Sequence, residues 1–365
     1  MKKTWIIIYK TCVFVILFAI FFTSCSPKTA NNSIKHEQSE EAVKLYGAGS
    51  TFASNLYHEY FNTLHQKLGI QFEYRENGSI GGLVQLIEKN VNFAATEVPM
   101  QIEQMQKAGS TILHIPTGIG AVAIAYHLEG VVSLNLDAYV LANIFMGNIR
   151  RWSDEAIKEL NPEINLPDKD ILVIHRFDRS GTAYAFSVFL SRNNAEWEKL
   201  LGASASLNWP IGINAEGNQG MADAIKNTPN SIGFLSLGHA TQNQLTIASI
   251  RNKKGNYIAP SVRTITYATE DINIPQDTLF SLVNAENDLA YPICTINWMV
   301  VYRDQAEGLA SPADAKQLFQ VLHWIISEGQ SINEIHFFAP LSEEMIKKAK
   351  HLLNSLTYEG NPIKK

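Results

Sequence analysis

The sequence has 365 residues, 46% of them hydrophobic and 18% charged, which is enough for two domains with sizeable cores and is ordinary for a globular protein. Its formal net charge is −5 at pH 7, and the lack of an excess of basic residues argues against nucleic acid as a partner. The histidines are scattered and no metal-ligand spacing is present, so the sequence indicates no metal site and no cofactor.

Residues 1–24 have the features of a secretory signal peptide. Lys2 and Lys3 begin a basic segment, residues 5–22 are largely apolar, and small residues precede Cys25. A cysteine at this point resembles a bacterial lipobox, which predicts cleavage before Cys25 and a lipid on that residue. The alternative is an N-terminal anchor helix that is not cleaved. Cleavage would remove three lysines and no acid, so the mature chain would be more acidic than the full one.

The segment after the signal is polar and has no apolar period. Residues 25–41 therefore read as a lipidated cysteine followed by a flexible tether. Once Cys25 carries a lipid, Cys294 is the one thiol left in the mature chain. No intramolecular disulfide is then available, although the compartment is oxidising.

Two units of strand, turn and helix follow in order. The first has a strand at 43–46, a turn that contains Thr51 and Phe52, and a helix whose apolar residues recur at steps of three and four until Gly69. The second has a strand at 71–75, a turn at 76–82 that contains Ser79, and a helix at 83–89. Hydroxyls and free backbone N–H groups at such helix starts favour anions.

A buried strand at 91–96 ends at Glu97. Open α/β sheets bind ligands at the carboxyl ends of their strands, so this carboxylate lies where a ligand would bind. The alternative is an acid in a solvated loop.

The third unit carries the clearest chemistry. A strand at 171–174 leads through Arg176 and Asp178 to Ser180, Gly181 and Thr182, and residues 182–190 read as a helix. The guanidinium of Arg176 suits a tetrahedral oxyanion, and Asp178 is placed to hold it. The alternatives are an ordinary helix cap made by the Ser-Gly-Thr turn and a weak surface ion pair.

The rest of the chain continues to alternate between predicted helices and strands. Helices are predicted at 139–145, 155–160 with Ser153 as cap, 221–226, 315–327 and 343–356, and a strand at 232–235. Apolar β runs at 121–126 and 298–302 bracket the middle of the chain. They predict two lobes joined by paired hinge strands, in an α/β fold with a cleft between the lobes.

A carboxylate in an anion site is informative. It repels a fully ionised oxyanion and accepts a hydrogen bond from one that still carries a proton. Phosphate near neutral pH is protonated and sulfate is not, so Glu97 would favour phosphate and penalise sulfate.

These motifs resemble the substrate-binding proteins of bacterial phosphate ABC transporters, the PstS family. The resemblance covers most of the chain from about Leu45 onward and rests on six stretches in the family's order: Gly47–Phe52, Gly78–Gly82, Phe93–Pro99, Gly147–Trp152, Arg176–Thr182 and Trp209–Gly212. It implies a type II periplasmic-binding-protein fold with two mixed-sheet lobes. The lobes would be 42–119 with 295–365, and 120–294.

The resemblance also implies the phosphate contacts. They are Thr51, the backbone N–H of Phe52, Ser79, Glu97, Arg176, Ser180, Gly181 and Thr182, with Asp178 as support. Three positions depart from the family: Glu97 stands where Asp is usual, Ile80 where Ser is common, and Arg179 where a small or polar residue is frequent. The longer side chain of Glu97 puts its carboxylate one methylene further out.

The function implied is that of a monomeric, lipid-anchored receptor in the cell envelope. It would bind inorganic phosphate and deliver it to the transmembrane permease of the transporter, without being an enzyme. Two other functions stay open. One is a secreted phosphatase on the same scaffold, with Ser180 as the nucleophile and His175 as a base near it in sequence. Neighbouring strand residues point to opposite faces, so Arg176 in the cleft would put His175 on the other side, which argues against this function. The other is a receptor for another protonated oxyanion such as arsenate.

Overall fold

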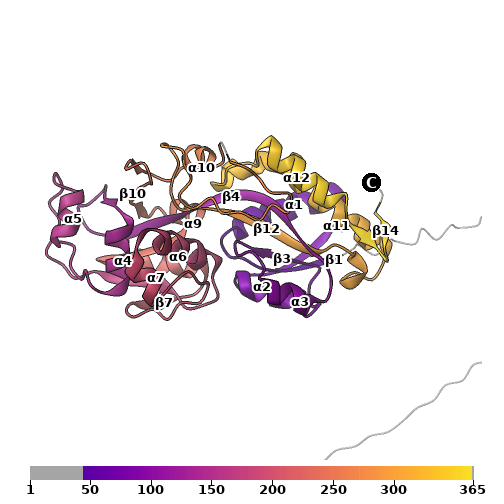
Figure 1. Cartoon of the computed structure of the whole chain (residues 1–365), viewed down its shortest axis with the longest axis horizontal. Coiled ribbons are helices and arrows are strands. Elements are labelled where there is room, and N and C mark those ends of the chain that lie inside the picture. The colour runs from indigo at the N-terminus through magenta and orange to yellow at the C-terminus, as the bar shows by residue number, and fades with distance from the viewer. Residues whose placement is uncertain (1–43, 271, 364–365) are drawn as a thin grey trace, which may run out of the picture. The chain divides into compact units, whose positions relative to one another are not determined.

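The computed structural model describes residues 44–270 and 272–363. The predicted signal peptide, Cys25 and the tether therefore lie outside the described residues. The fold is α/β, with two lobes built around a curled mixed sheet (Figure 1). Within the described ranges, no helix combines the length and the apolar content that crossing a bilayer requires.

The first lobe takes its elements from both ends of the chain. Its elements are β1 (Lys44–Gly49), α1 (Ser54–Leu68), β2 (Gln71–Arg75), α2 (Ser79–Ile87), β3 (Phe93–Thr96), α3 (Ile102–Ala108), β12 (Cys294–Tyr302), α11 (Pro312–Ile325), α12 (Glu343–Leu353), the 3-10 helices Gln305–Glu307 and Glu328–His336, and a hairpin of β13 (Thr357–Tyr358) with β14 (Asn361–Pro362). Helices α2 and α3 lie on one side of its sheet, and α1, α11 and α12 on the other (Figure 1).

The second lobe comes from the middle of the chain. Its elements are β5 (Asn135–Leu136), α4 (Ala138–Met146), α5 (Glu155–Leu160), β6 (Leu172–Arg176), α6 (Gly181–Asn193), α7 (Ala195–Leu200), β7 (Ile213–Ala215), α8 (Gly217–Asn227), β8 (Ser231–Ser236), α9 (Leu237–Gln242), β9 (Thr246–Ile247), β10 (Ser249–Arg251), β11 (Tyr257–Ile258) and α10 (Val262–Tyr267).

One strand, β4 (Ile112–His127), belongs to both lobes. The strand order is β2-β1-β3-β12-β4-β8-β6-β7, with β9 also pairing with β4. Residues 112–121 of β4 pair with β12, and residues 122–127 pair with β8. All but the last residue of β4 are buried, because the strand has neighbours on both faces. The two β runs that predicted the hinge thus belong to β4, which runs through both lobes, and to β12, which pairs with it.

The predicted elements exist, but several of their starts were wrong. Strand β4 begins at Ile112 rather than at 121, β12 at Cys294 rather than at 298, and α11 at Pro312 rather than at 315. Helix α2 begins at Ser79, four residues before the predicted start, and it includes Gly82, which packs against β1: a Cβ on Gly82 would lie 2.5 Å from the carbonyl oxygen of Ala48. Helix α8 begins at Gly217, four residues before the predicted start. The cap of α5 is Asp154, whose side chain accepts the N–H of Ala156, and not Ser153.

Candidate functional site

Three helix starts from the two lobes meet between them. Thr51 lies in the turn between β1 and α1, Ser79 is the first residue of α2, and Ser180 caps α6, which begins at Gly181. Ser79, Ser180 and Thr182 are each 1% exposed and Thr51 is 8% exposed. The hydroxyls that the sequence singled out are therefore brought together and shielded from water.

Arg176 ends β6 and enters this cluster. Its Nε lies 2.6 Å from Oδ1 of Asp178, and its Nη2 donates to Oδ2 of the same residue. The remaining donors point to hydroxyls: Nη1 lies 3.4 Å from Thr182 Oγ1, and Nη2 lies 3.4 Å from Thr51 Oγ1. Because the arginine side chain is 1% exposed, Asp178 fixes a buried guanidinium whose free edge faces the hydroxyls.

Asn218 joins the hydroxyls of the two lobes. Its Nδ2 lies 3.0 Å from Thr51 Oγ1 and 3.1 Å from Thr182 Oγ1, while its Oδ1 accepts the N–H of Ser236 at 2.7 Å. Its own N–H also donates to Thr51. Asn218 is fully buried at the start of α8, so it fixes both threonines in one arrangement.

Glu97 follows β3 and reaches the same cluster. Three side chains donate to its carboxylate: Ser50 and Asn297 to Oε1, the latter at 2.5 Å, and Ser79 to Oε2 at 2.7 Å. Burial raises the pKa of the Glu97 carboxyl, and the hydroxyls of Ser50 and Ser79 and the charge of Arg176 act in the opposite direction. The donors therefore favour the ionised form that burial disfavours.

The lobes touch around these groups. A Cβ on Gly181 would lie 2.1 Å from Oε2 of Glu97 and 2.4 Å from Oγ of Ser79, so only glycine fits at this helix start. Nearby, the N–H of Ile80 donates to the carbonyl oxygen of Arg179 at 3.4 Å. The arrangement is that of a closed interlobe cleft.

Two expected contacts differ in detail. The N–H of Phe52 donates to Ser50 Oγ at 3.0 Å, and the ring of Phe52 packs edge-on against Phe338 with centroids 5.7 Å apart. The hydroxyl of Ser180 accepts the N–H of Ala183, as a helix cap does. The Phe52 N–H is thus occupied within the turn, whereas the Ser180 hydroxyl still has its proton to donate.

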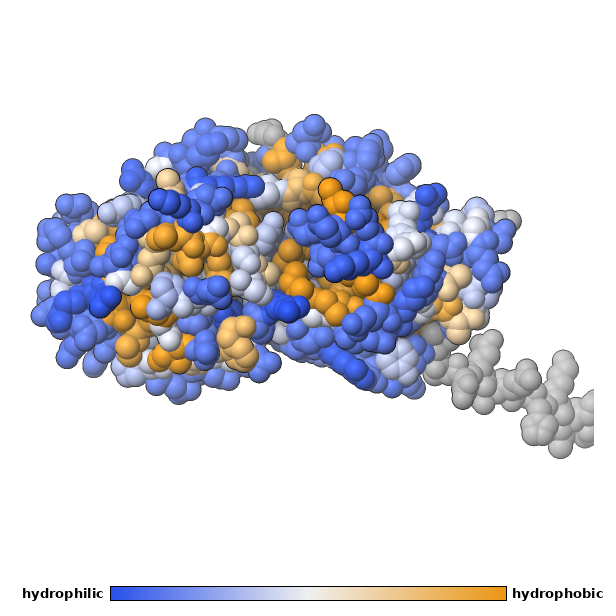
Figure 2. Space-filling model, turned by 60° about the horizontal axis from the view of Figure 1, so that its bottom comes forward, coloured by the Kyte–Doolittle hydropathy of each residue, from blue (hydrophilic) through white to orange (hydrophobic). Residues whose placement is uncertain are grey.

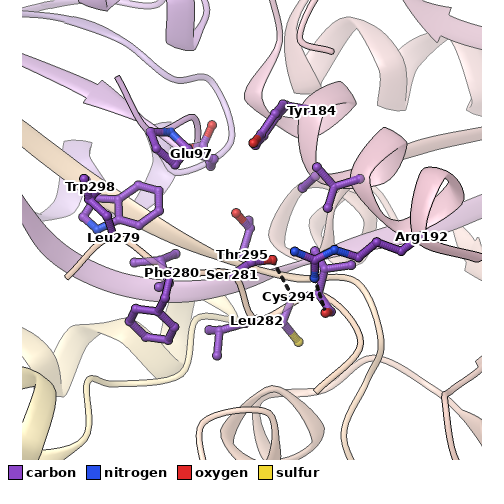
Figure 3. Close-up of a pocket in the computed structure, with 15 residues that line it drawn as sticks. Glu97, Tyr184, Arg192, Leu279, Phe280, Ser281, Leu282, Cys294, Thr295 and Trp298 are labelled. Carbon is purple, nitrogen blue, oxygen red and sulfur yellow. Dashed lines mark hydrogen bonds between the residues drawn. The ribbon is translucent and has the colours of Figure 1, made fainter. Parts of the chain in front are cut away.

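A pocket of about 270 Å³ adjoins the site at Glu97 (Figure 3). Tyr184 and Val188 of α6 line it on one side, Cys294 and Trp298 of β12 on another, and Phe280 faces them. In the space-filling view, hydrophobic residues gather in patches among hydrophilic ones (Figure 2). Since the pocket has walls from both lobes, separation of the lobes would widen it.

The sequence missed three of these residues. Ser50 stands in the turn that contains Thr51 and Phe52, but only the folded structure shows that its hydroxyl contacts Glu97. Asn218 stands in the stretch 217–220, which reads as a plain turn. Asn297 lies in a run of apolar β residues, where one amide gives no signal. Residues 44–270 and 272–363 contain no group of three or more His, Cys, Asp or Glu that could hold a metal ion.

Comparisons with known proteins place the chain in a family. Residues 35–328 match the model of the PBP superfamily domain. A phosphate-binding protein PstS from Pasteurella multocida strain Pm70 is 31% identical over 84% of this chain and 89% of its own length. One from Xylella fastidiosa strain Temecula1 is 30% identical over 90% of this chain and 93% of its own.

Solved structures show the same fold at low sequence identity. A high-affinity periplasmic phosphate-binding protein, PfluDING, bound with phosphate, has a TM-score of 0.71 at 16% identity and covers 87% of this chain and 97% of its own. The phosphate-binding protein of Stenotrophomonas maltophilia has a TM-score of 0.68 at 17% identity, with 85% and 94% covered.

Proposed function

Because the chain belongs to the PstS family of phosphate-binding proteins, within the PBP superfamily, we propose that it is the substrate-binding protein of a phosphate ABC importer. It binds one inorganic phosphate between its lobes and delivers it to the permease subunits. The observation that carries the proposal is the burial of Arg176, a set of hydroxyls and the Glu97 carboxylate together at the lobe interface.

The contacts we assign to phosphate are those expected from the sequence. They are Thr51, Phe52 through its backbone N–H once the ligand replaces Ser50 as its acceptor, Ser79, Glu97, Arg176, Ser180, Gly181 and Thr182, with Asp178 holding the arginine. Arg176 balances part of the phosphate charge, and the Glu97 carboxylate accepts a hydrogen bond from the proton that phosphate still carries. Sulfate brings no proton and would leave two negative charges facing each other in a buried site.

Binding without catalysis is supported by the position of the histidines. The ring of His175 stacks on Trp209 with centroids 5.0 Å apart and lies on the face of β6 opposite Arg176. A hydrogen bond of 2.6 Å joins Ser236 Oγ and His239 Nδ1, but the same hydroxyl accepts the N–H of His239 as the cap of α9. A hydrolase needs a nucleophile with a base beside it in reach of substrate.

We further propose that the protein is exported and held to a membrane by a lipid on Cys25, and that it acts as a monomer in the cell envelope. Residues 1–24 would be its signal peptide and 25–41 its tether. The lobes would comprise 42–119 with 295–365, and 120–294. Their boundaries fall on β4 and β12, the strands through which the sheet passes from one lobe to the other.

The test is calorimetric titration of the soluble protein from Ser26 onward, stripped of carried-over ligand, with phosphate and with sulfate at pH 7. We expect saturable binding of one phosphate per chain and no measurable binding of sulfate. Folded protein that binds neither ion would overturn the proposal and would direct attention to phosphatase assays. Arsenate, which is also protonated near neutral pH, is the third titrant, and tighter binding of arsenate than of phosphate would change the ligand assigned.

A further inference from the structure

Asn297 lies on β12 and contacts the carboxylate of the anion site. The residue is fully buried, and its Nδ2 donates to Oε1 of Glu97 at 2.5 Å. Its Oδ1 is also buried and has no hydrogen-bond partner among the described residues. An interior amide that leaves its acceptor unpaired costs stability, so packing alone does not account for an asparagine at this position.

The backbone of the strand pair is irregular at this position. Asn297 is opposite Gly118 and Trp298 is opposite Pro116, so Thr117 is an extra residue in β4. The hydroxyl of Thr117 donates to the backbone oxygen of Asn297 at 3.1 Å and holds the bulge. Bulges of this kind redirect side chains near functional sites. Here, the bulge lies opposite Asn297, whose side chain contacts the carboxylate of the anion site.

We propose that Asn297 is a positioning residue that keeps Glu97 ionised and thereby sets the pH range over which the site accepts a protonated oxyanion and rejects sulfate. The inference rests on the proposed phosphate-binding function and deepens it. The amide N–H stabilises the carboxylate without bringing a positive charge that would attract sulfate as well.

The surroundings of Glu97 make a neutral donor the appropriate group. Arg176 on β6 is the cation that acts on it, and Ser50 and Ser79 are its other donors. Tyr57 on α1 and Tyr74 on β2 also face its charge, and burial raises the pKa of both, so they remain neutral near pH 7. Asn297 adds a third hydrogen bond to a side chain that has one rotatable bond more than an aspartate.

The experiment measures sulfate and phosphate binding as a function of pH for the wild type and for Asn297→Leu. In the wild type, sulfate binding should appear only as the pH falls and Glu97 becomes protonated. Without the amide donor, the midpoint of that transition should rise by about one pH unit or more, because a hydrogen bond to a charged group contributes that much. Should the leucine variant fail to fold, Asn297→Ala removes the same donor, and the same direction of shift is expected.

Thr295→Val is the matched control, since it changes a side chain two residues earlier on the same strand. Its pH profile should equal that of the wild type. The variant Glu97→Gln should bind sulfate with no such transition, and adding Asn297→Leu to it should change nothing further. Wild-type protein that binds no phosphate would refute the proposed function. Phosphate binding with an unshifted profile in Asn297→Leu would refute this inference alone, and so would a further change in the double variant.

Discussion

Single residues in the site act mainly through fixed orientation. Arg176 is the one residue whose position depends on a charged partner, Asp178, that makes two hydrogen bonds to it. An isolated guanidinium has many rotamers, so part of any ligand binding energy would otherwise be lost in ordering it. The ion pair is also buried, which distinguishes it from the surface pairs of the chain.

We therefore expect Asp178→Asn to weaken phosphate binding by roughly 10-fold or more, because one of the two hydrogen bonds to Arg176 is lost and the other is weakened. Calorimetric titration measures the change. Asp168→Asn is the control, since Asp168 pairs with Arg151 on the surface, where the aspartate is 72% exposed. An equal effect of both substitutions would contradict the positioning role of Asp178.

The sequence could predict residues whose chemistry is unusual for their local pattern. Arg176, Asp178 and the Ser-Gly-Thr turn are polar groups directly after an apolar strand, and the structure places them together. Asn218 and Asn297 could not be predicted in this way. Asn218 contacts Thr51 across 167 residues of sequence and Asn297 contacts Glu97 across 200, and nothing local indicates either contact.

At the level of helices and strands, the site depends on helix starts that come unusually close to other backbone. Gly82 meets β1 inside α2, and Gly181 meets Glu97 and Ser79 at the start of α6. Glycine lowers helix propensity, so α2 was expected to begin four residues later than it does. Gly82, which obscured the start of α2 in the sequence, is thus the residue that the close packing of α2 on β1 requires.

Gly181→Ala should hinder closure of the lobes on the ligand. The added methyl group would overlap the carboxylate of Glu97, and overpacking of this kind costs about 1–3 kcal/mol, which corresponds to roughly 5- to 150-fold in phosphate affinity. Gly220→Ala in α8 is the control, because no atom lies within 4 Å of a Cβ at that position. Unchanged affinity in Gly181→Ala would show that closure does not bring these groups together in solution.

For the whole molecule, the sequence predicted two lobes and a hinge from two apolar β runs, since near-continuous apolar runs are typical of strands that are buried on both faces. The curled sheet that unites the lobes was not predicted. Strand order depends on pairings between distant segments, and β12 pairs with β3 and β4 across about half of the chain.

Closure can be followed through Cys294, the only cysteine of a protein that begins at Ser26. The residue lines the pocket between the lobes, is fully buried, and burial raises the pKa of its thiol. A maleimide should therefore react slowly with the closed form and faster when the lobes separate.

Phosphate at 100 times its dissociation constant should slow this labelling by about 100-fold, because it suppresses the open form by mass action. Mass spectrometry of the modified chain measures the rate. Urea-unfolded protein, which should react at once in either buffer, shows that phosphate does not affect the reagent. Equal rates with and without phosphate in the folded protein would mean that ligand binding is not linked to the exposure of this strand.

The position of β12 also affects the order in which the chain acquires its structure. This strand lies between β3 and β4, yet it is made about 200 residues after β3 and about 170 after β4. As the polypeptide emerges from its N-terminus, β3 has an unpaired edge until residues 294–302 arrive. The middle lobe, by contrast, is complete in sequence before then. Biogenesis of the first lobe is therefore the step most exposed to aggregation, and the one for which a chaperone would matter most.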